Sequence, residues 1–240
     1  MERNLACTAY TCQVKIETDV EIKTRTPLSR ERILHAAVTL ADRDGAESLS
    51  MRRLAQELGV VPMALYKHLA NKEEMLDGML DVVVVEIDPP LTDAEWKTAV
   101  RERILSARRA LLRHPWASRV METRTEPTPT VMSYMDSMIA MFRAGGFTID
   151  LTHHAMHTMG SRLMGFSQEL FNDNTDTTPE MEAEMYTAMA DSYPSIFELF
   201  LAVSHDDAST VGPGCDDQFE FEFALDLMLE GLDRIRTTAS

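Results

Sequence analysis

The residues of this chain that are best suited to chemistry form two groups, one of cations and one of histidines. The cationic group lies in the stretch Leu49–Lys72 and consists of Arg52, Arg53, Lys67, His68 and Lys72. Guanidinium and ammonium groups bind phosphate, and an arginine can also donate two hydrogen bonds to the edge of a guanine. This group therefore indicates contact with DNA.

The second group is an HHxxH motif formed by His153, His154 and His157. Two histidines four residues apart share one helix face, a spacing that can chelate zinc or copper. No cysteine or fourth ligand is near in sequence, so we favour solvated or cavity-lining histidines and predict no metal and no cofactor. The chain contains no P-loop, GxSxG, HExxH or dinucleotide-binding motif, so we predict that it is not an enzyme.

The cationic stretch predicts two short helices with a tight turn between them. Ser50 is suited to begin the first helix as its N-cap, and Met51–Leu58 places apolar residues on one face. Gly59 ends that helix, and Pro62 suits the first turn of a second helix that carries Met63–His68. Two helices joined in this way form a helix-turn-helix, whose second helix enters the major groove of DNA.

The charge of the chain is divided between its two parts. The whole sequence has a net charge of −16, which by itself argues against a nucleic-acid partner. Between Lys23 and Lys72, however, nine Lys and Arg face five Asp and Glu, a net charge of +4, whereas the residues from Glu73 onward carry −18. A basic head on an acidic body suits a protein that presents one end to DNA.

The segment Ser29–Leu80 resembles the DNA-binding domain of the tetracycline repressor (TetR) family of bacterial transcription regulators. The resemblance rests on RERILHAAVTLADRDG, on the LYKH run at 65–68, and on NKEEMLDGML. It extends more weakly along the body through GGFTIDLTHHAMHTMGSRLMGF and LMLEGLDRI. The resemblance implies a homodimer whose helical body holds a cavity for a small-molecule effector.

The DNA-binding candidates come from the helix-turn-helix and the residues that follow it: Ser50, Arg52, Pro62, Met63, Ala64, Tyr66, Lys67, His68 and Lys72. We expect Arg52 to contact a base edge, and Met63 and Ala64 to contact thymine methyl groups. The later polar residues are better suited to phosphate, so they set the register of binding rather than its sequence preference. Two-fold symmetry of a dimer predicts a palindromic operator in double-stranded DNA.

The predicted fold class is all-α, with an N-terminal three-helix helix-turn-helix DNA-binding domain and a C-terminal helical ligand-binding and dimerisation domain. We divide the chain into a flexible N-terminal extension (1–28), the DNA-binding domain (29–88) and the second domain (89–240). The last element, Gln218–Ile235, alternates apolar and polar residues as a strand does, yet its length, acidity and Leu, Met and Ala content favour a helix. As a helix it has two apolar faces, which indicates a dimer interface.

The body is rich in methionine, with 11 of the 17 methionines between Met121 and Met189. Flexible thioether side chains adapt to irregular space, both in an ordinary core and around a ligand. Our cavity candidates are Met121, Met135, Met138, Phe142, His157, Met164, Phe166 and Phe197. Where the tetracycline-binding members of the family hold the drug–magnesium complex with a histidine, this chain aligns Met121, so we predict a larger and more apolar effector.

These observations predict a ligand-responsive transcriptional regulator, most simply a repressor that a small apolar molecule releases from its operator. A transcriptional activator of the same fold is one alternative, and a metal-dependent enzyme that uses the HHxxH histidines is another. No basic segment followed by an apolar run marks a signal peptide, and no apolar stretch is long enough for a membrane span. Three cysteines fit free thiols, so we expect a cytoplasmic protein without a membrane partner.

Overall fold

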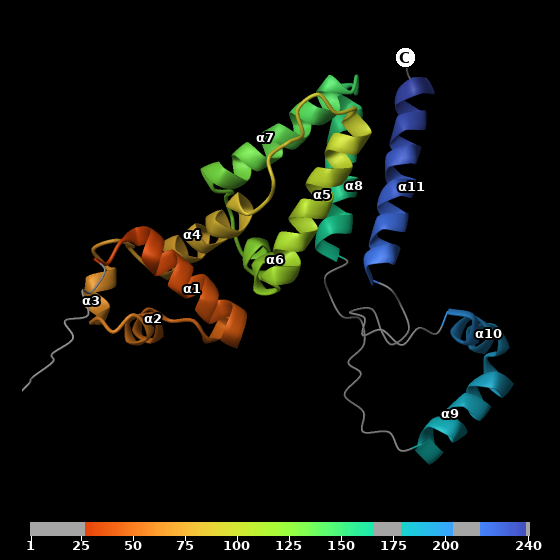
Figure 1. Cartoon of the computed structure of the whole chain (residues 1–240), viewed down its shortest axis with the longest axis horizontal. Helices are drawn as coiled ribbons and strands as arrows, with labels where there is room; N and C mark the ends of the chain where they lie inside the picture. Colours follow the sequence, from red (N-terminus) through yellow and green to blue (C-terminus); the bar gives the residue numbers. More distant parts are fainter. Residues whose placement is uncertain (1–26, 166–178, 204–216, 239–240) are drawn as a thin grey trace, which may run out of the picture.

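The computed structural model describes residues 27–165, 179–203 and 217–238, and this part of the chain is helical (Figure 1). The N-terminal helices are α1 (Arg30–Asp44), the 3-10 helix η1 (Ala46–Ser48), α2 (Met51–Glu57), α3 (Pro62–Leu65) and α4 (Lys72–Val85). The helices that follow are α5 (Trp96–Arg113), α6 (Trp116–Glu122), α7 (Pro129–Ala144), α8 (Ile149–Gly165), α9 (Pro179–Ser192), α10 (Pro194–Val203) and α11 (Asp217–Thr238). The all-α prediction is confirmed for the described residues.

Side-chain caps fix where the N-terminal helices begin. The Ser29 and Ser50 hydroxyl oxygens each accept a hydrogen bond of 3.2 Å from a backbone N–H three residues later. The Asn71 side chain accepts one of 2.8 Å from the Glu74 N–H and begins α4. Gly45 and Gly59 follow α1 and α2 with φ angles of 79° and 65°, a backbone conformation that glycine adopts without steric cost. The two ends predicted for the first helix of the helix-turn-helix, Ser50 and Gly59, therefore lie where the sequence places them.

One hydrophobic cluster joins the helix-turn-helix to the body. Ile33, Leu54 and Leu65 are completely buried in it together with Met75 and Met79 of α4. The same cluster continues into α5 and α6 through Ala110, Leu111, Trp116, Ala117 and Val120. Because burial of apolar surface is the main stabilising term, α4 is held on both sides and packs as part of both regions.

A second hydrophobic cluster holds α5, α7, α8 and α11 together. Its centre is an aromatic group in which the Phe147 ring lies 4.7 Å from the Trp96 ring and 5.1 Å from the Phe142 ring, both edge to face. Phe221 of α11 is fully buried against this group of helices. In contrast, α9 and α10 pack against each other and stand apart from the other helices in Figure 1.

The last helix, α11, has the two apolar faces that the sequence predicts. Phe221, Leu225, Leu229 and Leu232 are buried against the body. On the other face Phe219, Phe223, Leu227 and Ile235 are each at least half exposed. The helical assignment is therefore confirmed over the strand pattern.

Several predicted boundaries were wrong. The second helix of the helix-turn-helix ends at Leu65 rather than His68, because Leu69 turns into the core and the Ala70 N–H is bonded by the Glu74 carboxylate at 2.6 Å. The sequence also predicts a helix over roughly Asp93–Arg113, and this helix begins at Trp96. It predicts Asp150 as the N-cap of a long helix through Phe171, but that cap is supplied by Thr148, whose hydroxyl accepts from the Leu151 N–H at 3.1 Å.

Some expectations concern residues outside the described ranges. These are residues 1–26 of the N-terminal extension, Phe166, the end of the helix expected to reach Phe171, the loops at 172–178 and 204–216, and the three cysteines. Among the helices that are described, none is both long and apolar enough to cross a membrane.

Candidate DNA-binding surface and ligand cavity

The helix-turn-helix presents a surface that is both apolar and cationic. Val61, Met63 and Tyr66 are 69%, 71% and 46% exposed on and beside α3. Large apolar side chains are seldom exposed together without a partner, and the major groove offers thymine methyl groups to such contacts. Of the other predicted DNA-binding residues, Arg52, Pro62, Lys67 and Lys72 are exposed, and Ala64 and His68 are half-buried.

The two neighbouring arginines of α2 differ in what they contact. Arg53 bonds Asp44 of α1 at 2.6 Å, so it fixes α2 against α1. Arg52 makes no ion pair or side-chain hydrogen bond with any described residue, and neither does Lys67 or Lys72. These three cations are therefore available to DNA. Ser50, also a candidate, has its hydroxyl engaged as the N-cap of α2, which places it at the start of the surface rather than free to contact a base.

Helix α4 connects this surface to the interior of the body. It begins at Lys72, beside the helix-turn-helix, and its far end supplies Leu80, Val83 and Val84 to the wall of a cavity. Ile87, just beyond the helix, lines the same cavity. A molecule in the cavity thus touches the helix on which the DNA-binding surface is mounted.

The cavity has a volume of about 520 Å³ and lies among α4, α5, α6, α7 and α8. Five of the eight predicted ligand-binding residues line it, namely Met121, Met135, Met138, His157 and Met164. Further residues that were not predicted also line the cavity, among them Tyr134, Ile139, Met156, Met159 and Leu163. Tyr134 and Ile139 lie four residues from Met138 and Met135, and Met159 lies five residues from Met164. This helical spacing is the signal that could have identified those three.

Two of the predicted lining residues lie elsewhere. Phe142 is completely buried against the Trp96 and Phe147 rings, because it points from α7 into the second hydrophobic cluster rather than into the cavity. Phe197 is on α10, which packs on α9 and stands apart from the helices that line the cavity (Figure 1). The prediction that Phe142 and Phe197 line the cavity was therefore wrong.

The cavity wall carries few polar groups. The Thr152 hydroxyl already donates to the Thr148 carbonyl oxygen at 2.8 Å. His153 and His157 line one side, with ring centroids 4.6 Å apart, and are exposed. No group of three or more His, Cys, Asp or Glu side chains that could hold a metal occurs in the described part of the chain. The histidines are placed to contact a ligand at the edge of the cavity.

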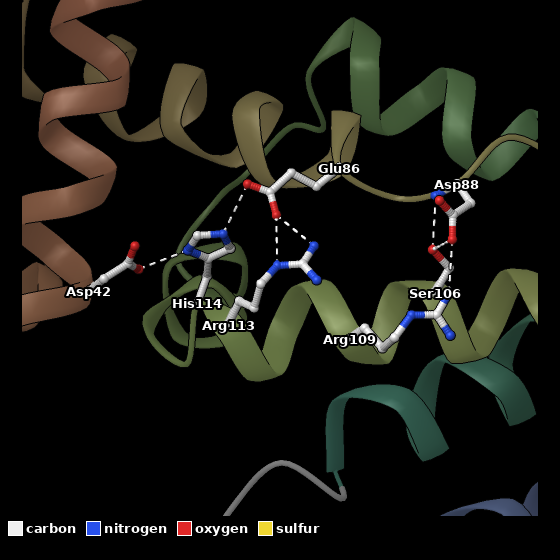
Figure 2. Close-up of polar contacts among 7 residues, drawn as sticks. All are labelled: Asp42, Glu86, Asp88, Ser106, Arg109, Arg113 and His114. Carbon is white, nitrogen blue, oxygen red and sulfur yellow. Dashed lines mark hydrogen bonds and ion pairs between the residues drawn. The ribbon is translucent and has the colours of Figure 1, made fainter.

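A network of charged side chains fixes the far end of α4 on α5 (Figure 2). The buried His114 ring bonds Asp42 of α1 through Nδ1 at 2.8 Å and Glu86 through Nε2 at 3.1 Å. Each of the two ring nitrogens thus lies within hydrogen-bond distance of a carboxylate oxygen. Arg113 donates to the same Glu86 at 2.7 and 3.0 Å, and the Trp116 indole donates to Asp42 at 2.6 Å.

The contacts of Glu86 in this network favour its ionised form. Burial raises the pKa of Glu86, but hydrogen bonds from Arg113 and His114 outweigh it and leave the pKa below its ordinary value. A second contact follows at Asp88, which bonds Ser106 at 2.7 Å and Arg109 at 2.8 Å (Figure 2). The network ties α1, the end of α4, and α5 together, and sequence analysis missed it.

A helix-turn-helix joined by one helix to a body with an apolar cavity defines a ligand-responsive DNA-binding regulator. Two family models match the chain accordingly. The model for bacterial regulatory proteins of the tetR family matches residues 33–79, and the model for the tetracyclin repressor-like C-terminal domain matches residues 89–236. The chain belongs to the TetR family of bacterial transcriptional regulators.

Individual relatives agree with this assignment. The HTH-type transcriptional repressor DrrR1 of Streptomyces coeruleorubidus is 30% identical over 215 residues, which cover 86% of this chain and 77% of the relative. The structure of apo ActR from Streptomyces coelicolor is similar with a TM-score of 0.69 at 25% identity, over 90% of this chain and 99% of that one. ActR in complex with actinorhodin gives a TM-score of 0.67 at 26% identity, over 88% and 99%.

Proposed function

We propose that this protein is a homodimeric repressor that binds a palindromic operator and is released from it by a small apolar molecule. The observation that carries the proposal is the course of α4, which begins beside the exposed cations of the helix-turn-helix and ends in the cavity wall. A ligand that displaces Val83 or Ile87 shifts the helix that positions the DNA-binding surface. Occupancy of the cavity and DNA binding are thereby coupled, and each weakens the other by the same factor.

The exposed face of α11 supports the homodimer. Phe219, Phe223, Leu227 and Ile235 leave an apolar stripe along 22 residues of helix. A face of this kind is stabilised when it packs against the same face of a second copy, as two-fold symmetry requires. Two copies then present two helix-turn-helix units to successive major grooves, which is why we propose a palindromic operator.

The proposed class of effector is based on the lining of the cavity and on a relative of this chain. The lining is almost entirely aliphatic and thioether, and its volume of about 520 Å³ accommodates a drug-sized molecule. Met121 lines the cavity at the position where the tetracycline-binding members of the family align a histidine, so this chain offers no matching metal ligand there. ActR binds actinorhodin, which supports a comparably large organic effector for this chain in place of tetracycline with magnesium.

Repression is proposed over activation because DrrR1 is a repressor. A protein that acts by binding chromosomal DNA works in the cytoplasm, and we propose that it acts without catalysis. A reporter gene whose promoter overlaps the bound DNA sequence tests whether the protein lowers or raises transcription. Repression requires that production of the protein lower reporter output; a rise in output would establish the activator alternative instead. The same assay with Arg52→Ala is the control for DNA binding.

A further inference from the structure

Beneath the apolar cavity wall lies a buried pair of polar side chains whose hydrogen bonds are not satisfied. Tyr134 of α7 lines the cavity, and its hydroxyl is buried without a hydrogen-bond partner among the described residues. Arg103 of α5 is only 9% exposed, and its Nε–H is likewise buried without a partner. A buried polar group left unpaired costs about 1–3 kcal/mol, so two such groups side by side at a cavity call for an explanation.

The pair is arranged to donate hydrogen bonds rather than to accept them. The Arg103 guanidinium carbon lies 4.9 Å from the centre of the Tyr134 ring, and a guanidinium has no acceptor atom. Within the described residues its one hydrogen bond, of 3.3 Å, is donated to the Ile87 carbonyl oxygen, and it forms no ion pair there. Burial lowers the pKa of Arg103, yet a guanidinium stays charged at neutral pH.

The tyrosine is held in its protonated form. Burial raises the pKa of Tyr134 to about 12, and the nearby positive charge of Arg103 only partly opposes that rise. At neutral pH the hydroxyl is therefore a hydrogen-bond donor beside a cation, and the complementary group is an oxygen acceptor.

We propose that Tyr134, backed by Arg103, selects the effector: the cavity takes an apolar molecule that carries a ketone or quinone carbonyl, whose oxygen accepts a hydrogen bond from the Tyr134 hydroxyl. The proposal rests on the proposed function, since it takes the cavity to be the effector site. The carbonyl reaches the hydroxyl by displacing side chains of the wall. Met138, one helical turn further along α7, also lines the wall, and its thioether adapts readily.

The position of the pair also connects it to α4. The Ile87 carbonyl that Arg103 bonds belongs to the segment that follows α4, and the Ile87 side chain lines the same cavity. An acceptor oxygen near Arg103 competes with that carbonyl for the guanidinium. The carbonyl of the effector is thus placed to loosen a contact at the end of the linking helix.

The test uses fluorenone and fluorene, which share one three-ring skeleton and differ by a carbonyl oxygen. Their dissociation constants are measured by equilibrium dialysis with the native full chain, with Tyr134→Phe, and with Tyr193→Phe as a matched control at a residue that is 62% exposed. We expect the native protein to bind fluorenone about tenfold more tightly than fluorene, the size of one hydrogen bond. Tyr134→Phe removes that difference, leaves fluorene binding within about twofold, and does not lower the melting temperature.

The outcomes separate this inference from the proposed function. Equal binding of the two probes to the native protein, or a difference that survives in Tyr134→Phe, would overturn the role of Tyr134 while leaving the cavity as a ligand site. Binding of neither probe would overturn both the role of Tyr134 and the cavity as a site for apolar effectors. DNA binding, measured on the same samples, reports separately on the helix-turn-helix.

Discussion

Substitution of His114 by Phe removes the central member of the network that joins α1, α4 and α5. The ring is 7% exposed and is hydrogen-bonded to Asp42 and Glu86, so the change deletes two hydrogen bonds to carboxylates while keeping a ring of similar size. Hydrogen bonds to charged groups contribute about 1.5–3 kcal/mol each. Both carboxylates keep a partner, Trp116 for Asp42 and Arg113 for Glu86, so no buried charge is left unpaired.

The remaining partners and the partial exposure of the carboxylates reduce the expected effect. The Asp42 and Glu86 side chains are 31% and 34% exposed, so solvent screens part of the interaction. We expect the free energy of unfolding to fall by about 2 kcal/mol. For a chain of this length that is a drop in melting temperature of about 4–8 °C.

The assay is thermal unfolding followed by circular dichroism at neutral pH, with Arg109→Ala as the matched control. Arg109 belongs to the same row of contacts on α5, but its ion pair with Asp88 is exposed on both sides, so solvent screens it and its loss has little effect on stability. A melting temperature of His114→Phe within about 1 °C of the native value, or no lower than that of Arg109→Ala, would refute the view that the buried network stabilises the junction.

Three further predictions concern DNA contacts, assembly and pH. Arg52→Ala relaxes the sequence preference at one position of each half-site, whereas Lys72→Ala weakens binding to all DNA sequences and lowers the salt dependence of binding by about one counterion. Binding titrations at several salt concentrations distinguish the two variants. An unchanged sequence preference in Arg52→Ala would show that Arg52 does not contact a base. Phe223→Glu places a charge on the exposed face of α11, and we expect light scattering to show a monomer. A variant that stays dimeric would exclude this face as the dimer interface. Because the folded-state pKa of Glu86 lies below its ordinary value of 4.5, its stabilisation is complete above that pH and is lost as the pH falls through the lower folded value. The difference in melting temperature between the native chain and Glu86→Gln is therefore expected to shrink below about pH 4.5, and a constant difference down to pH 3 contradicts it.

Much of the fold could be predicted from the sequence because it depends on local signals. Ser29, Ser50 and Asn71 cap the helices that follow them because each can satisfy a first-turn N–H with its own side chain. The helix-turn-helix and the order of the helices depend on such signals and on apolar periodicity. In α11 the same periodicity predicted two apolar faces, and the structure places one against the body and exposes the other.

What the sequence did not provide depends on contacts between distant residues. Periodicity places Phe142 on an inward face of α7 but does not distinguish the cavity from the aromatic cluster beside it. His114 and Asp42 are 72 residues apart, and nothing in the local pattern of either predicts their bond. Arg103 and Tyr134 likewise come from different helices. No local pattern predicts that the Arg103 Nε–H and the Tyr134 hydroxyl are buried without a hydrogen-bond partner among the described residues.

The proposed function requires this chain to bind a specific DNA sequence as a two-fold symmetric dimer. The most direct test is selection of bound sequences from a random duplex library with the protein at near-physiological salt. We expect enrichment of a palindrome whose half-sites lie about one helical turn apart or a multiple of it. Enrichment of a single, unrepeated half-site would contradict the dimer, and no enrichment at all would contradict specific DNA binding by the helix-turn-helix.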